Sequence, residues 1–201
     1  LSRCLFGNHV PIIISQHMNP EIFLDSNLKT SLIKFFYPLA DKTVCVSKEV
    51  ERILNEKFNI KNTLTIYNMM DIESNIKLSL KDLPIECEEF IKNDDENFNF
   101  MNMGRLTRQK GQWFIIRSFR RVVDHNSSVK LFILGEGVLR KDLEELINKL
   151  QLMDNVHLLG EQKNIFPLLK YSDCFILSSL WEGLPLVLIE ALSMDLPVIS
   201  T

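Results

Sequence analysis

The sequence lacks any run of about 18 apolar residues, the length that a membrane-spanning helix needs, and it contains few cysteines. Its four cysteines lie far apart, with no C-x-x-C pair and no spacing to the four histidines that suits a metal. These absences argue against a membrane span, a disulfide framework and a zinc site, and they indicate a cytosolic protein with reduced thiols. The net charge of −3 argues against binding to nucleic acid through phosphate contacts.

The glycine-rich loop of dinucleotide-binding enzymes is also missing. No apolar segment is followed by G-x-G-x-x-G, so a Rossmann dehydrogenase is the least favoured class. The segment Gly135–Gly137 has two glycines of a phosphate-binding loop but not the third, which makes it a weak signal.

What the sequence does contain is an alternation of strands and helices. The expected strands are 10–14, 43–47, 63–68, 98–103, 130–135, 156–160, 174–179 and 197–200. The expected helices are 28–39, 48–58 with Ser47 as its cap, 112–123, 139–150, 165–171 and one that begins at Pro185. Near-continuous apolar strands joined by helices predict parallel sheets covered on both faces, with ligands at the C-terminal ends of the strands.

The composition changes in the middle of the chain. Residues 71–97 are polar and acidic, with Pro84 and the run NDDEN that begins at Asn93. We therefore expect the end of a first domain at 1–70, a linker at 71–97 and a second domain at 98–201. Since the sequence begins with leucine and stops in a strand, we expect a fragment of a longer protein.

The helix expected at 28–39 has an apolar stripe. A stripe at this spacing favours a face turned to the core. Contact with a membrane is the alternative, although Lys29 and Lys34 are few for a basic interfacial face. The stripe consists of Leu28, Leu32, Phe35, Phe36 and Leu39.

A basic loop follows the strand expected at 98–103. In GRLTRQKG, Gly104 and Gly111 bracket Arg105 and Lys110. At the end of a strand, an arginine fork and a lysine point charge would hold a diphosphate. A solvated basic loop is the alternative interpretation.

Two carboxylates, Glu182 and Glu190, flank the apolar segment of EGLPLVLIE. Pro185 suits the first position of a helix, which places Glu182 in the preceding loop and Glu190 on the second turn. The helix is apolar nearly all round, so we expect it to be buried, where a lone carboxylate needs hydrogen-bond donors. Ligand hydroxyls at Glu190 and an anion at the helix N-terminus together describe a nucleotide. A carboxylate that reaches solvent is the alternative for Glu190.

Together these segments resemble the retaining nucleotide-sugar glycosyltransferases of group 1, family four. The segments GRLTRQKG, LFILGEGVLRKDLEELINKL, VHLLG, YSDCFILSSLWEGLPLVLIEAL and PVIST follow the C-terminal domain of that family in order, and IIISQH, ADKTVCVS and IYNMMDIE follow the later part of its N-terminal domain. The resemblance implies an α/β protein of the GT-B fold, with two Rossmann-like domains and parallel sheets. The chain would hold the end of the first domain and most of the second. Asp195 stands where the family commonly has glycine, at a helix end that needs a left-handed residue, which aspartate tolerates.

The resemblance also implies roles for individual residues. Arg105 and Lys110 would hold the donor diphosphate and stabilise the charge on the leaving nucleotide, while Glu190 would accept hydrogen bonds from the ribose. His17 would face the transferred sugar, and Asn68 matches an asparagine near the domain hinge; a structural loop histidine and a turn asparagine are the alternatives. The implied catalytic residues are His17, Arg105, Lys110 and Glu182. The implied donor-binding residues are Gly104, Arg105, Lys110, Glu161, Gln162, Glu182, Gly183, Leu184, Leu186 and Glu190.

By this resemblance the protein moves a sugar from a UDP- or GDP-linked donor to a hydroxyl of a glycan or lipid-linked acceptor, in cell-surface polysaccharide or lipopolysaccharide synthesis. We expect no metal, no other cofactor and no nucleic-acid partner, because the nucleotide sugar is itself the substrate. The implied location is the cytoplasm, with peripheral contact on the inner face of the membrane. A catalytically silent nucleotide-sugar-binding subunit and a GT-B nucleotide-sugar epimerase are the alternatives. Intact Arg105, Lys110, Glu182 and Glu190 argue against the silent subunit, and GRLTRQKG fits an epimerase poorly.

Overall fold

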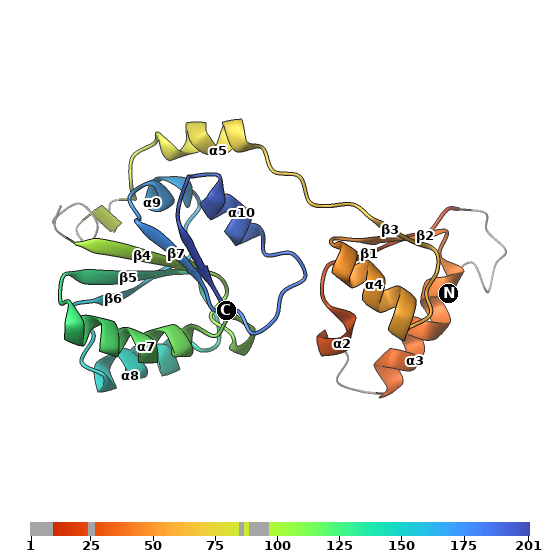
Figure 1. Ribbon diagram of the computed structural model, residues 1–201, viewed down its shortest axis with the longest axis horizontal. Helices are drawn as coiled ribbons and strands as arrows, with labels where there is room; N and C mark the ends of the chain where they lie inside the picture. Colours follow the sequence, from red (N-terminus) through yellow and green to blue (C-terminus); the bar gives the residue numbers. More distant parts are fainter. Residues whose placement is uncertain (1–9, 24–26, 85–86, 89–96) are drawn as a thin grey trace. The chain divides into compact units, whose positions relative to one another are not determined.

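The structure is a computed structural model of the 201-residue chain that describes residues 10–23, 27–84, 87–88 and 97–201 (Figure 1). By its contacts the chain divides into two units, residues 1–69 with 181–184 and residues 70–180 with 185–201. Each unit has a parallel sheet with helices between strands, which confirms the predicted α/β class.

The first unit contains a three-stranded parallel sheet in the order β1-β2-β3. Its strands are β1 (Ile13–Gln16), β2 (Lys42–Cys45) and β3 (Thr63–Thr65), and its helices are α2 (Pro20–Phe23), α3 (Asn27–Phe36) and α4 (Lys48–Lys57). Ser47 caps α4 as predicted, because its hydroxyl accepts a hydrogen bond from the backbone N–H of Val50 at 3.3 Å. Ile53 and Leu54 on α4 are buried in the core of this unit together with Cys45 of β2.

Four of the five residues of the predicted stripe on α3 and the following turn are exposed and Phe36 is half-buried, so the prediction that the stripe faces the core is wrong. Leu28 is 70% exposed and Phe35 is 65% exposed. The helix instead turns Ile33 toward the core of its unit, and Tyr37 in the following 3-10 turn packs beside it. The Tyr37 hydroxyl donates to the Gln16 side chain at 2.7 Å, which fixes that orientation. No helix in the described part of the chain is both long and apolar enough to span a bilayer.

The second unit contains a five-stranded parallel sheet in the order β6-β5-β4-β7-β8. The strands are β4 (Phe98–Met103), β5 (Val129–Leu134), β6 (Val156–Gly160), β7 (Cys174–Leu177) and β8 (Val198–Ser200). The helices are α5 (Ile72–Ser79), α7 (Gln112–His125), α8 (Arg140–Lys149), α9 (Phe166–Lys170) and α10 (Leu186–Leu192). Figure 1 shows α7 and α8 on one face of the sheet and α9 and α10 on the other. The strand order reverses at β4, and ligands bind at such a switch point in open parallel sheets.

The segment expected to be a linker, 71–97, contains helix α5, which groups with the second unit. Asp71 caps this helix, since its carboxylate accepts hydrogen bonds from the N–H and the hydroxyl of Ser74 at 3.0 and 2.7 Å. Beyond the helix, Leu83 and Cys87 are buried in the core on the α9 and α10 side of the sheet. The polar composition of residues 71–97 therefore did not predict that these apolar residues pack in the core of the second unit.

Asp195 lies in the turn after α10 and has the left-handed conformation that its position predicts, with a φ of 57°. The backbone N–H of Leu196 then donates at 3.3 Å to the carbonyl of Ala191, which also accepts a hydrogen bond from the N–H of Met194 at 3.0 Å. The aspartate therefore makes the turn for which the family commonly has glycine.

Candidate functional site

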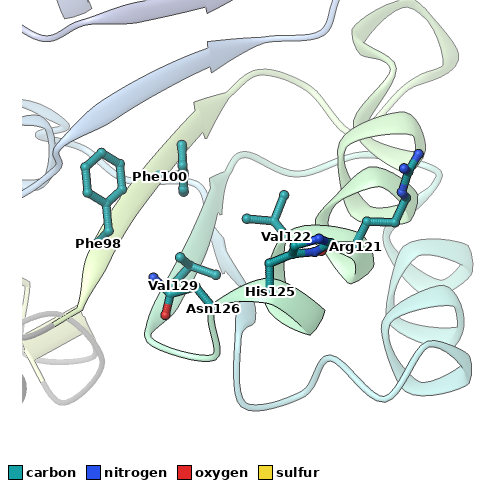
Figure 2. Close-up of a pocket in the computed structure, with 7 residues that line it drawn as sticks. All are labelled: Phe98, Phe100, Arg121, Val122, His125, Asn126 and Val129. Carbon is teal, nitrogen blue, oxygen red and sulfur yellow. The ribbon is translucent and has the colours of Figure 1, made fainter.

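An apolar hollow of about 550 Å³ lies where β4 and β5 begin (Figure 2). Its lining consists of Phe98, Phe100, Arg121, Val122, His125, Asn126 and Val129. The ring centroids of the two phenylalanines are 4.8 Å apart, and the Arg121 side chain points away from them. Because ligands of parallel sheets bind at the opposite, C-terminal ends of the strands, we do not place the site here.

A pocket of about 400 Å³ opens at that opposite end, where β4, β5 and β6 finish. The fold brings four of the predicted donor-binding residues into its wall, namely Gly104 and Arg105 after β4 and Glu161 and Gln162 after β6. The whole lining is Met103, Gly104, Arg105, Leu134, Gly135, Glu136, Glu161, Gln162, Ile165 and Val187. This pocket is the candidate site.

Backbone hydrogen bonds join the three loops that form the pocket. The N–H of Gly104 donates to the carbonyl of Leu134 at 3.0 Å, and the N–H of Gly135 donates to the carbonyl of Gly160 at 2.7 Å. Gly135 has a φ of 127°, and a Cβ placed on it would lie 2.3 Å from the Gly104 carbonyl oxygen. Only glycine allows this close approach, so the first glycine of GEG serves the packing of one loop against the next.

Lys110 lies against Gly104, which gives the spacing of GRLTRQKG a physical reason. A Cβ on Gly104 would lie 3.0–3.2 Å from the Cδ, Cε and Cγ atoms of Lys110. The lysine stem therefore occupies the space that a side chain at position 104 would fill. The loop is held further by Ser178, whose hydroxyl donates to the Lys110 carbonyl at 2.7 Å. The fold thus places the lysine next to the residue that precedes Arg105.

Arg105 is the basic side chain of the pocket wall. It is exposed, and no residue in the described ranges hydrogen-bonds its guanidinium, so its fork can bind a ligand. The backbone of Arg105 is held by Gln112, whose fully buried side-chain amide donates to the Arg105 carbonyl at 3.2 Å. A free guanidinium on an anchored backbone suits a site for phosphate oxygens.

Glu190 lies on the second turn of α10, as predicted, but the helix differs from the prediction in two ways. It begins at Leu186, so Pro185 occupies the cap position before the first helical residue. Of its seven residues only Ala191 is buried, and Leu192 is 54% exposed, because the short helix packs one face on the sheet. Glu190 itself is half-buried, and burial raises the pKa of its carboxyl group above the usual value.

Glu190→Gln is expected to stabilise the second unit at neutral and alkaline pH. Because the pKa of Glu190 is raised in the folded protein, the ionised carboxylate lowers the free energy of unfolding at pH values above that pKa. Well below about pH 4 the group is protonated in both the folded and the unfolded protein, so it has no such effect. We expect the free energy of unfolding in urea to rise by roughly 0.5 kcal/mol at pH 8, a small gain because water screens the charge of a half-buried group, and the gain should fade as the pH falls. Glu145→Gln, an exposed control on α8, should show no such trend. A gain at Glu190 that does not depend on pH would contradict the assigned cause.

The other predicted residues lie outside this pocket. Glu182, Gly183 and Leu184 lie in the loop between β7 and α10, are half-buried, and group by their contacts with the first unit. Their roles, and that of Leu186 at the start of α10, stay predictions.

His17 and Asn68 belong to the first unit. His17 is exposed directly after β1, where its Nε2 hydrogen-bonds the Ser15 hydroxyl at 2.8 Å. Asn68 is half-buried in the extended segment after β3. A histidine that ends a parallel strand is well placed for a ligand role, and its function stays a prediction.

Two residues of the pocket region were missed by sequence reasoning, Glu136 and Arg140. Glu136 lines the pocket, and Arg140, at the start of α8, forms an ion pair with it. The available signal was the arginine four residues after the glutamate of GEG. It was weak because such i, i+4 pairs are common on helix surfaces.

Comparison with known proteins agrees with the parallel α/β architecture of the chain. Residues 86–201 match the family model described as glycosyl transferases group 1. The chain belongs to this family. Over 201 residues it is 45% identical to the uncharacterized glycosyltransferase MJ1059 of Methanocaldococcus jannaschii, a match that covers 97% of this chain and 49% of the relative.

A second relative is named in more detail. The chain is 31% identical over 204 residues to N-acetylgalactosamine-N,N'-diacetylbacillosaminyl-diphospho-undecaprenol 4-alpha-N-acetylgalactosaminyltransferase of Campylobacter jejuni, with 98% of this chain and 52% of the relative covered. The chain therefore spans about half the length of these curated relatives.

Solved structures show the same fold at low identity. TarM of S. aureus matches with a TM-score of 0.77 and 21% identity over 96% of this chain and 36% of that chain. Anabaena Alr3699/HepE in complex with UDP and glucose matches with a TM-score of 0.77 and 21% identity over 94% of this chain and 52% of that chain. These matches establish that the chain has the GT-B fold of such glycosyltransferases.

Proposed function

We propose that the protein transfers a sugar from a nucleotide-diphosphate sugar to a hydroxyl of a lipid-linked glycan, with retention of configuration at the anomeric carbon. The observation that carries the proposal is the pocket at the ends of β4, β5 and β6, whose wall combines Arg105 with Glu161 and Gln162. The names of relatives support both substrates, since one specifies a diphospho-undecaprenol acceptor and a similar structure contains UDP and glucose.

In the proposed reaction the bond between the anomeric carbon and the diphosphate oxygen breaks, and the acceptor oxygen bonds that carbon on the same face. The acceptor proton passes to the leaving diphosphate, so the protein supplies no nucleophile. Arg105 and Lys110 stabilise the charge that develops on the diphosphate. Glu190 accepts hydrogen bonds from the ribose, which relieves the burial of its carboxylate.

The remaining roles complete the donor site. Glu161 and Gln162 contact the base. Glu182 and the N–H groups of Gly183, Leu184 and Leu186 contact the donor sugar and the phosphates, and His17 faces the sugar. The acceptor carries its lipid in a membrane, so the protein works in the cytoplasm with peripheral contact on the inner face and contributes to cell-surface polysaccharide synthesis.

Calorimetric titration of UDP, with GDP and ADP as comparators, tests the donor half of the proposal. We expect the chain to bind one of these nucleotides, and Glu190→Ala to weaken that binding by about 1–3 kcal/mol. Circular dichroism establishes first that both proteins are folded, and Glu145→Ala on α8 is the matched control. A folded wild-type chain that binds none of the three would contradict the donor site.

Transfer itself is tested with the bound nucleotide's sugar conjugates and an undecaprenyl-diphosphate-linked saccharide. The expected product has the anomeric configuration of the donor, as measured by the one-bond carbon–proton coupling of the new linkage. Activity should persist in EDTA, because no metal takes part in the proposed step. An inverted product, or activity that EDTA abolishes, would overturn the mechanism.

A further inference from the structure

Arg140, the first residue of α8, makes three contacts that converge beside the pocket. Its guanidinium forms an ion pair with Glu136 through Nη1. Its Nε atom donates to Glu144 Oε1 at 2.9 Å, and its Nη2 atom donates to the backbone carbonyl of Leu158 at 3.3 Å. Arg140 therefore links the loop after β5 to strand β6, the two elements on either side of one wall of the pocket.

The Glu136 carboxylate is held over the end of β6 by this arrangement. A Cβ placed on Gly160 would lie 3.1 Å from Glu136 Oε1 and 3.8 Å from Arg140 Nη1. Both carboxylate and guanidinium thus occupy the space above the glycine. The absence of a side chain at position 160 gives the ion pair its room.

The charges of the pocket wall show why the ion pair between Glu136 and Arg140 affects ligand binding. The charged residues of the lining are Arg105, Glu136 and Glu161, one positive and two negative. A nucleoside diphosphate is strongly anionic, and an uncompensated carboxylate in the same wall would repel it. Arg140 forms ion pairs with both Glu136 and Glu144, so it offsets part of the negative charge of Glu136 and restrains where that carboxylate lies.

We propose that Arg140 is a positioning residue for the donor, which binds Glu136 and offsets its charge so that the pocket accepts a nucleoside diphosphate. This inference rests on the proposed function. Arg140 acts through Glu136 and through the wall that the two residues form.

The test is calorimetric titration of UDP, or of GDP if the wild-type chain binds GDP instead, into Arg140→Met. We expect affinity to fall about tenfold at low salt, since the freed carboxylate repels the diphosphate, and the loss to shrink at 0.5 M salt. Adding Glu136→Gln to Arg140→Met should restore affinity to within about twofold of the wild type. A purely structural role for Arg140 predicts no such rescue.

Arg120 on α7 provides a matched control. It forms an ion pair with Asp124 at 2.7 Å and donates to the carbonyls of Leu150 and Gln151, and its side-chain exposure of 30% is close to the 35% of Arg140. Arg120→Met therefore removes a similar set of contacts away from the pocket wall. We expect it to bind the nucleotide as the wild type does.

Each outcome decides the inference. Wild-type affinity in Arg140→Met, or an Arg140→Met defect that Glu136→Gln leaves unchanged, overturns it while the donor site stands. No nucleotide binding by the wild-type chain removes the proposed function and this inference with it. If circular dichroism shows that Arg140→Met does not fold, Glu136→Gln alone decides: about threefold tighter binding supports neutralisation, and unchanged or weaker binding overturns it.

Discussion

Arg105→Met is expected to weaken binding of the donor nucleotide by about 2–3 kcal/mol, or roughly 30–150-fold. The guanidinium is the basic group of the pocket wall, and no other side chain of the described lining could replace the charge-assisted hydrogen bonds that we propose it makes to phosphate oxygens. Methionine keeps much of the apolar stem, so the loss reports the charge and the donors. The measurement is calorimetric titration of UDP or GDP.

Arg108 is the matched control for this substitution. It is an exposed arginine of the same loop that is not among the described lining residues. Arg108→Met should change the affinity by less than about twofold at physiological salt, because charges outside the pocket are screened. Equal losses from the two substitutions would mean that the loop attracts the nucleotide only through its general charge.

Gly135→Ala is expected to lower the free energy of unfolding of the second unit by about 3 kcal/mol. The φ of 127° is strained for any residue with a Cβ, and the new methyl group would lie 2.3 Å from the carbonyl oxygen of Gly104. A backbone atom cannot move aside as a side chain can, so the loop that carries Arg105 must shift. Urea unfolding measures the stability, and nucleotide titration of the folded fraction should show a parallel loss of affinity.

Gly160→Ala separates the strain from the clash. Its φ of 71° is also positive, but the added methyl group would meet only the far ends of two side chains, Glu136 at 3.1 Å and Arg140 at 3.8 Å. We expect a cost of about 1 kcal/mol, the price of a left-handed residue alone. Equal costs at positions 135 and 160 would show that the contact between the loops after β4 and β5 is not as close as described.

Much of the candidate site could be predicted because its signals are local. A strand that ends in glycine followed by Arg105 can be recognised in the sequence, and in a parallel sheet all strands present their C-terminal ends at one edge. The residues after β4 and β6 therefore had to converge, although many residues separate Gly104 from Gln162. The pocket confirms that convergence.

The sequence could not show which apolar faces are covered. The periodicity on α3 identifies residues that share a face, but Leu28 and Phe35 on that face are exposed while Ile33 packs on the core. The apolar run of α10 likewise predicted full burial, yet a helix of seven residues packed on a sheet buries one side. Periodicity shows which side chains share a face of a helix, and the neighbouring elements determine whether that face is buried.

The part played by Glu136 and Arg140 is a tertiary feature. Along the chain they are an ordinary pair four residues apart, with Glu136 in the loop before α8 and Arg140 as its first residue. The position of their ion pair beside the pocket depends on Gly160, which is distant in sequence and has no side chain in the space that the pair fills. No local pattern contains that information.

Hydrogen exchange of the chain with and without its nucleotide, followed by mass spectrometry, tests the central claim most directly. We expect slower exchange in the loops after β4, β5 and β6, at residues 104–106, 135–139 and 161–165, and no change around the hollow of Figure 2 at residues 98–100 and 125–129. Protection confined to that hollow, or binding that leaves all three loops unchanged, would contradict the assignment of the donor pocket.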